Sequence, residues 1–266
     1  PLMNTNVNTA TPAKPRRNAF LLFIHKLGSP PWFYAFSGKL IPWLWLVFAL
    51  LSAWGLYLGL VKGPADYLQG ESVRIMYIHV PSAWMSMLIY TSMAIMGFIA
   101  LVWRIRIMEV LAMSSAPVGA AFTLVALATG SLWGRPTWGT YWVWDARLTS
   151  ELVLLFLYLG VMGLYSAIDE PRKAARAACL LALVGLVNLP IIHFSVKWWN
   201  TLHQPNSISI TGGSSIDPSM LWPLLIMAFA VKFYYAANLL TRARVKLLEQ
   251  DLRKGWTRDV AREKAQ

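Results

Sequence analysis

Six apolar runs of bilayer length constrain this chain of 266 residues more than any other feature. An α-helix needs roughly 20 apolar residues to cross the hydrocarbon core of a membrane. Runs of about this length lie at residues 41–61, 78–102, 110–132, 150–168, 177–196 and 220–240. The sequence therefore predicts an all-α integral membrane protein with six transmembrane helices.

The composition indicates the same class. The chain is 57% hydrophobic and only 14% charged, whereas a soluble domain carries about a quarter charged residues. We expect one membrane domain over residues 1–240, which begins with an interfacial segment at 1–40, and a basic tail at 241–266. Leucines and charges at helical spacing in this tail predict a helix that leaves the membrane. Residues 15–40 mix basic and aromatic side chains with a Pro-Pro break, which predicts an interfacial helix before the first span.

The positions of the basic residues predict the topology. Lys and Arg gather near the N-terminus, in the loops at 102–109 and 169–177, and after residue 240. The positive-inside rule places these parts in the cytoplasm, so both termini are expected there. The segment 132–149 and the loop 197–219 then face the periplasm of a bacterial inner membrane. A net charge of +12 with this distribution reflects topology and excludes a nucleic-acid-binding face.

The segment 132–149, LWGRPTWGTYWVWDARLT, is the most unusual part of the predicted outer side. It combines four tryptophans with an acid and two arginines: Trp133, Trp138, Trp142, Trp144, Asp145, Arg135 and Arg147. Tryptophan at a membrane edge is usually an anchor in the headgroup layer. From the residues alone, this interpretation and a platform for a flat apolar ligand are equally open. The Gly and Pro residues between the tryptophans favour a shaped loop.

Three acidic or basic side chains near the fourth span need partners. Asp145 and Arg147 pair with each other in one interpretation, and in the other Asp145 caps the helix that starts near Thr149. Glu151 lies just inside the span, where a charge facing lipid is costly. We expect Glu151 to face the bundle and to have a partner there.

Three histidines lie on or near the predicted outer side. They are His79 in YIHVPSAW, His193 in NLPIIHFS, and His203 in KWWNTLHQ, which follows Trp198 and Trp199. Imidazole is an axial ligand of haem iron, and two imidazoles on opposite faces give six-coordinate iron. Any single histidine at a membrane edge is more often structural, and this role suits His193 better than His203. His79 and His203 are therefore the predicted iron ligands, with His193 as second choice.

Three stretches resemble the haem-handling WWD proteins of cytochrome c maturation. They are WGRPTWGTYWVWDARLTSELVLLFLYLG, PADYLQGESVRIMYIHVPSAWMSM and NLPIIHFSVKWWNTLHQ. Within that group the chain resembles the haem exporter protein C (CcmC) family, over residues 32–240. The six spans and the length agree with that family and disagree with the larger WWD lyases.

The resemblance implies a haem-handling subunit that is not an enzyme by itself. It implies that the WWD segment holds haem b non-covalently, with iron between His79 and His203, at the periplasmic face. Trp198 and Trp199 are also expected to contact the haem. It also implies delivery to a haem chaperone, CcmE, within a complex of CcmA, CcmB and CcmD subunits in which another chain is the ATPase. We further hypothesise that Arg135 and Arg147 lie near the haem propionates.

Two other functions stay open at this point. A membrane b-type redox protein usually needs histidine pairs at both membrane sides, and the inner side offers only His25. A permease subunit of a haem exporter needs polar residues along a path through the spans. The spans offer only a small set: Glu109, Asn188, Glu151 and Lys232. The inner loops carry no GxxxxGK[ST] motif for phosphate binding, so ATP hydrolysis by that route is not expected.

Overall fold

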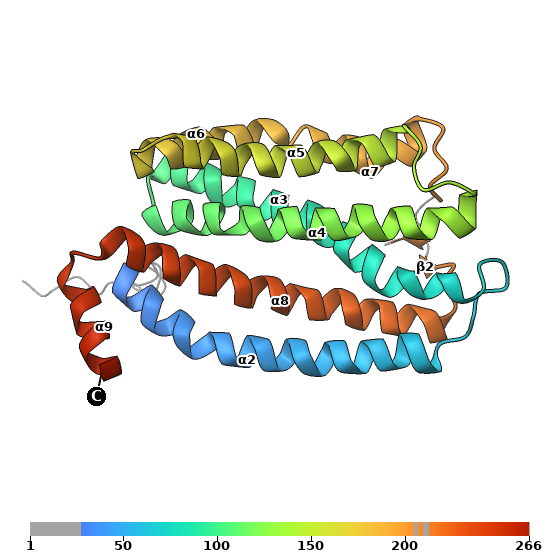
Figure 1. Cartoon of the computed structure of the whole chain (residues 1–266), viewed down its shortest axis with the longest axis horizontal. Helices are drawn as coiled ribbons and strands as arrows, with labels where there is room; N and C mark the ends of the chain where they lie inside the picture. Colours follow the sequence, from blue (N-terminus) through green and yellow to red (C-terminus); the bar gives the residue numbers. More distant parts are fainter. Residues whose placement is uncertain (1–27, 205–206, 210–212, 266) are drawn as a thin grey trace, which may run out of the picture.

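The computed structural model describes residues 28–204, 207–209 and 213–265. Figure 1 shows its long helices side by side along one axis. The elements are α2 (Pro30–Leu56), η1 (Tyr57–Lys62), η2 (Glu71–Ile75), α3 (Met76–Trp103), α4 (Arg106–Trp138), α5 (Ala146–Ala167), α6 (Pro171–Gly185), α7 (Asn188–Trp198), β1 (Ile208–Ser209), β2 (Gly213–Ser214), α8 (Pro218–Asp251) and α9 (Gly255–Ala265). The two short strands pair antiparallel in the loop between α7 and α8.

Six helical segments are long and apolar enough to cross a membrane. They are Pro30–Lys62, Glu71–Trp103, Arg106–Trp138, Ala146–Ala167, Pro171–Trp198 and Pro218–Asp251. Each contains all or nearly all of one predicted apolar run. The prediction of an all-α protein with six spanning helices is thus confirmed, and the chain is a multi-pass membrane protein.

The first and last spanning helices extend beyond the predicted runs. Pro30 and Pro31 begin α2 instead of separating two helices, because proline suits the first helical turn, where a backbone N–H has no partner. Residues 30–40 therefore belong to α2, and the rest of the predicted interfacial helix lies outside the described residues. At the other end of the chain, α8 continues past Leu240 to Asp251.

The fifth spanning segment is a broken helix. Helix α6 ends at Gly185 and α7 begins at Asn188. The side chain of Asn188 donates a hydrogen bond to the carbonyl oxygen of Ser150 on α5, at 2.9 Å. This bond satisfies a polar group inside the bundle and holds α7 against α5, which fixes where the loop after α7 leaves the membrane.

Helices α3 and α4 pack along each other at the centre of the bundle, and α8 connects them to α2. Helices α5, α6 and α7 cover the opposite side (Figure 1). The core contains the fully buried rings of Tyr90 and Tyr158, which meet edge to face with centroids 5.0 Å apart. Gly119 on α4 leaves the space that the Tyr158 ring occupies. The two ends of α4 are thus separated by a closely packed centre.

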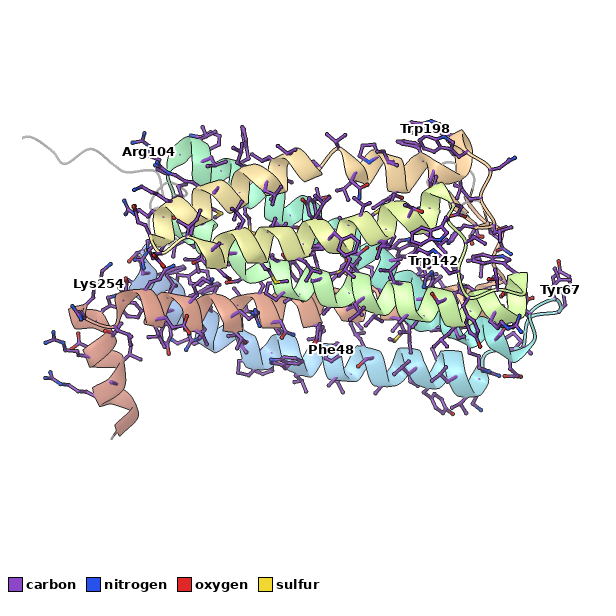
Figure 2. All side chains as sticks on the ribbon, turned by 45° about the horizontal axis from the view of Figure 1, so that its top comes forward. Phe48, Tyr67, Arg104, Trp142, Trp198 and Lys254 are labelled. Atoms are coloured by element: carbon purple, nitrogen blue, oxygen red, sulfur yellow. The ribbon has the colours of Figure 1, made fainter. Side chains whose placement is uncertain are left out.

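The two ends of the bundle carry different side chains. Figure 2 labels Tyr67, Trp142 and Trp198 towards one end, and Arg104 and Lys254 towards the other. We call them the His79 end and the Asp251 end. At the Asp251 end, the last turn of α8 is bound to the first turn of α4 through charged side chains.

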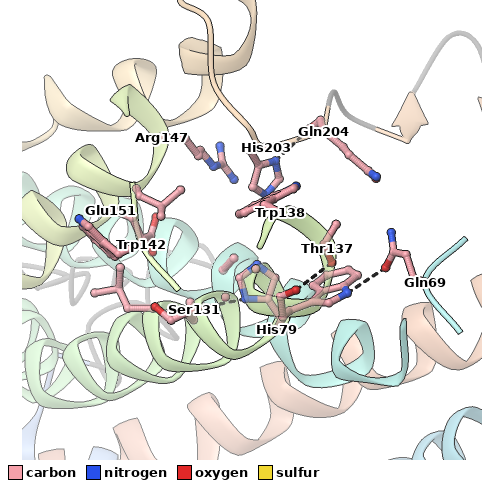
Figure 3. A pocket seen from close by; sticks show the side chains of 17 residues that line it. Gln69, His79, Ser131, Thr137, Trp138, Trp142, Arg147, Glu151, His203 and Gln204 are labelled. Atoms are coloured by element: carbon pink, nitrogen blue, oxygen red, sulfur yellow. Dashed lines mark hydrogen bonds between the residues drawn. The ribbon is translucent and has the colours of Figure 1, made fainter. Parts of the chain in front are cut away.

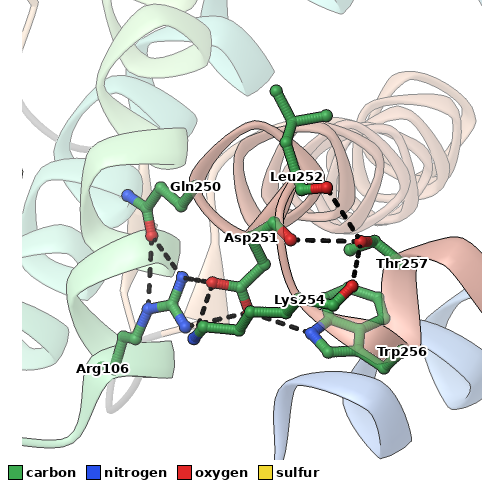
Figure 4. Close-up of polar contacts among 7 residues, drawn as sticks. All are labelled: Arg106, Gln250, Asp251, Leu252, Lys254, Trp256 and Thr257. Carbon is green, nitrogen blue, oxygen red and sulfur yellow. Dashed lines mark hydrogen bonds and ion pairs between the residues drawn. The ribbon is translucent and has the colours of Figure 1, made fainter.

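Asp251 is the centre of that connection (Figure 4). Its carboxylate accepts hydrogen bonds from Arg106 on α4 at 2.7 Å and from the indole of Trp256 on α9 at 3.0 Å. Lys254 lies 2.9 Å from the same carboxylate. Arg106 also donates to the side-chain oxygen of Gln250 at 2.9 Å. These bonds fasten α4, α8 and α9 together.

Candidate functional site

A pocket opens at the His79 end between α3, α4, α5 and the loop after α7 (Figure 3). It encloses about 760 Å³ of space between its lining atoms, its open mouth included. Six predicted site residues line it: His79, His203, Trp133, Trp138, Trp142 and Arg147. The structure therefore brings both predicted iron ligands and three of the four tryptophans to one place.

His79 is held in one orientation by α4. Its Nδ1 lies 3.0 Å from the carbonyl oxygen of Ala126 and 3.1 Å from Oγ1 of Thr129. Because a carbonyl oxygen only accepts, Nδ1 carries the hydrogen and Nε2 keeps its lone pair. The imidazole lies against Gly130, where a Cβ atom would stand 2.9 Å from its Cε1. Only a residue without a side chain leaves this space for the ring.

His203 has the same arrangement in a different element. Its Nδ1 lies 2.9 Å from the carbonyl oxygen of Gln204, so Nε2 again keeps the lone pair. Burial lowers the pKa of His203 below the ordinary 6.5, and the positive charge of Arg147 lowers it further. The imidazole is therefore neutral at neutral pH, which is the form that binds metals. Figure 3 shows it entering the pocket from the side opposite His79.

The tryptophan segment forms an aromatic wall. Helix α4 includes Trp133 and Trp138 and ends before Gly139, whose φ of 79° is in the left-handed region. The Trp133 indole donates a hydrogen bond to Gln69 at 2.8 Å. The Trp142 indole nitrogen is buried and has no hydrogen-bond partner within the described part of the chain. A buried donor without an acceptor is unusual, and here it belongs to a residue that lines the pocket.

Asp145 connects the tryptophan segment to the His203 loop. Its carboxylate caps α5 by accepting from the backbone N–H of Leu148 at 2.8 Å, and it also accepts from the N–H of Leu202 at 3.2 Å. Of the two interpretations of Asp145, the structure supports the cap. The second bond places His203 relative to α5, because Leu202 immediately precedes it.

Arg147 and Glu151 follow on α5 and line the inner part of the pocket. Arg147 donates to the carbonyl oxygen of Ile192 on α7 at 2.6 Å. Glu151 is buried and accepts a hydrogen bond from Ser86 on α3 at 2.7 Å. The prediction that Glu151 faces the bundle and has a partner is confirmed. Its position one helical turn after Arg147 was a signal that it also borders the pocket.

Comparison with known proteins supports the resemblance in the outer motifs. A family model described as Heme exporter protein C matches residues 23–258. The Heme exporter protein C of Bradyrhizobium diazoefficiens is 52% identical over 227 residues, which cover 85% of this chain and 86% of the relative. That of Escherichia coli K12 is 49% identical over 237 residues, with 89% and 96% covered. That of Haemophilus influenzae is 46% identical over 239 residues, with 90% and 97% covered.

This chain belongs to the haem exporter protein C family. The matched region includes the whole pocket: Gln69, at the edge of the second span, and Gln204, in the loop before α8, lie well inside residues 23–258. Neither glutamine was predicted as a site residue. Gln204 follows His203 directly, and Gln69 lies in one of the three stretches that carry the resemblance, so the sequence offered a signal for both.

Three predicted site residues of the tryptophan segment lie outside the pocket lining: Asp145, Arg135 and Trp144. Arg135 donates to the carbonyl oxygen of Gly139, and its guanidinium lies 5.7 Å from the ring centre of Tyr141. Trp144 is 77% exposed and meets Trp142 edge to face, with centroids 5.4 Å apart. Within this family member, Arg135 stabilises the end of α4 and Trp144 covers the outside of Trp142.

The aromatic residues of α7 also lie outside the lining. Trp198 stacks on Phe194 with centroids 5.1 Å apart, and Trp199 meets Trp198 edge to face. His193 also contacts Phe194, with ring centroids 4.7 Å apart. The structure therefore groups His193 with an exposed aromatic row on α7 and groups His203 with His79.

Proposed function

We propose that this protein binds haem b in the pocket, with His79 and His203 as the axial ligands of iron, and presents it for delivery during cytochrome c maturation. The observation that carries the proposal is the orientation of the two imidazoles. Both commit Nδ1 to a backbone carbonyl and leave Nε2 free within one pocket. Two neutral imidazoles are the ligand set of six-coordinate, low-spin haem.

The remaining pocket residues fit the two kinds of surface that a haem presents. The rings of Trp133 and Trp138 provide apolar surface for a flat macrocycle. The buried donor of Trp142 and the guanidinium of Arg147 suit its carboxylates, because a carboxylate only accepts hydrogen bonds. We therefore assign Arg147 to a propionate, while Arg135 stays a prediction from the sequence alone.

Membership of the family supports the wider context of the proposal. We infer that the chain lies in a bacterial inner membrane with the His79 end in the periplasm and both termini in the cytoplasm. It acts on the haem chaperone CcmE, in a complex with CcmA, CcmB and CcmD, and another subunit hydrolyses ATP. The His203 loop suits the transfer of haem to a partner. Leu202, next to His203, is 46% exposed, so a partner can reach this side of the pocket.

The test compares three histidine variants by absorbance and by pyridine haemochrome after purification. His79→Ala and His203→Ala are each expected to remove the low-spin spectrum and to lower haem content at least about tenfold, because each removes one bond to iron. His193→Ala is the matched control and is expected to keep the wild-type spectrum. Unchanged ligation in both of the first two variants, or loss only in the control, would reject the ligand assignment.

A further inference from the structure

A second, smaller cleft lies at the Asp251 end, far from the haem pocket. It encloses about 290 Å³ of space between α4, α5, α6 and α8, its open mouth included. Charged and polar side chains dominate its lining: Arg106, Glu109, Tyr165, Arg172 and Gln250. Nothing in the proposed haem function uses this cleft.

The cleft lies at the depth of lipid headgroups. Its residues come from the first turns of α4 and α6 and from the end of α5 and of α8. Helix α4, whose first turn borders the cleft, has 33 residues, or about 50 Å, and a hydrocarbon core is about 30 Å thick. The ends of the helices therefore extend into the interfacial layer, and Pro171 and Arg172 are exposed there.

The charges in the cleft do not satisfy one another. Glu109 is half-buried, and within the described residues its carboxylate has no hydrogen bond and no ion pair within 4 Å. Arg172 and Arg176 lie within electrostatic range of it, also without such a partner, while Arg106 is bound to Asp251 and Gln250. A carboxylate and a guanidinium thus border one space without meeting.

We propose that this cleft binds the phosphoethanolamine headgroup of a membrane lipid. The phosphate, which accepts hydrogen bonds, would contact Arg172, and the ammonium group, which donates them, would contact Glu109. Such a headgroup carries both charges, separated by two carbons, and matches a cleft lined by both. An anionic glycerol headgroup leaves Glu109 without a partner, and a choline headgroup has no N–H to donate.

The test measures which lipid the intact protein retains. The protein is placed in nanodiscs with equal amounts of phosphatidylethanolamine, phosphatidylglycerol and phosphatidylcholine, released into mild detergent, and examined by native mass spectrometry. We expect phosphatidylethanolamine to be retained about threefold over each of the others, as a partly exposed charge pair provides. Equal retention of the three lipids in the wild type overturns the proposal, as does a preference for phosphatidylglycerol.

Two variants assign the preference to the cleft. Glu109→Gln is expected to abolish the preference over phosphatidylcholine and to raise retention of phosphatidylglycerol, whereas Arg172→Gln is expected to lower retention of phosphatidylethanolamine. Glu170→Gln and Lys173→Gln are matched controls, because these exposed residues pair with each other at 2.7 Å at the start of the same helix. A control that changes retention as much as the cleft variants overturns the proposal. Arg172→Lys keeps the charge and is expected to keep the preference.

Discussion

The polar side chains at the two ends of the bundle differ in whether they have partners within the protein. At the Asp251 end, the carboxylate of Asp251 is paired with Arg106, Lys254 and Trp256. At the His79 end, His79 and His203 each use only Nδ1 in a hydrogen bond within the described residues, and the buried Trp142 indole nitrogen has no partner there. A neutral imidazole Nε2 is a hydrogen-bond acceptor and metal ligand, and a buried indole N–H without a partner costs free energy. The presence of these three atoms at one pocket therefore suits a ligand that satisfies them.

The comparison separates fastening from binding. The charged contacts at the Asp251 end hold the helices together. At the His79 end, the hydrogen bonds to Nδ1 fix the orientation of each imidazole and leave its Nε2 available to a ligand. Helix α4 connects the two ends with 33 residues, or about 50 Å. Substitutions at opposite ends are therefore expected to act independently, one on stability and the other on haem binding.

The largest effect is expected from Asp251→Asn. Arg106 loses the charge that compensates its own, so the free energy of unfolding should fall by about 2 to 3 kcal/mol. Unfolding in mixed detergent micelles measures this loss, and haem content per folded molecule should not change. Glu170→Gln is the control, since its exposed pair with Lys173 contributes less than about 1 kcal/mol. Equal losses of unfolding free energy in the two variants would show that the Asp251 cluster does not stabilise the helix packing.

The spanning helices were predictable because bilayer thickness sets how long an apolar run must be. Their ends were not, because no apolar pattern marks where a helix stops in the interfacial layer. Pro30 was expected to belong to a break and instead begins α2, whereas the helix expected after Leu240 is the continuation of α8 to Asp251. The break between α6 and α7 was also missed, since an apolar run looks the same whether or not its helix is interrupted.

Much of the pocket was predictable for a different reason. Histidine and clustered tryptophan are rare at a membrane edge, so His79, His203 and Trp142 were visible as unusual residues. Gln69 lies in one of the stretches that carry the resemblance, but a glutamine is a common residue there. Its place at the site became visible only from the structure, where it lines the pocket and accepts a hydrogen bond from Trp133. Arg147 lines the pocket and Arg135 does not, because α4 ends at Gly139 between them. Residue types alone do not reveal where that helix ends.

A smaller effect is expected from Gly130→Ala, which tests whether the packing of His79 matters for binding. The added Cβ atom would lie 2.9 Å from Cε1 of the imidazole, so the ring must shift. We expect haem affinity to fall roughly tenfold, about 1.4 kcal/mol, measured by haem titration of the purified apoprotein. Gly163→Ala on α5 is the matched control, because no atom lies within 4 Å of its added Cβ. Wild-type affinity in both variants would show that the ring position at Gly130 is unimportant.

The smallest effect distinguishes the two arginines of the tryptophan segment. Burial and the charge of Arg147 lower the pKa of His203 below 6.5, while Asp145 acts weakly in the opposite direction. Protons compete with iron for the imidazole, so a lower pKa keeps the bond intact to lower pH. Arg147→Gln removes one lowering influence and raises the pKa of His203, so it should move the midpoint of acid-induced haem release to higher pH. Arg135→Gln should leave the midpoint unchanged, because Arg135 is bound to Gly139 outside the pocket.

Absorbance of haem-loaded protein during acid titration measures both midpoints. A downward shift in Arg147→Gln, or equal shifts in the two variants, would contradict the role given to Arg147.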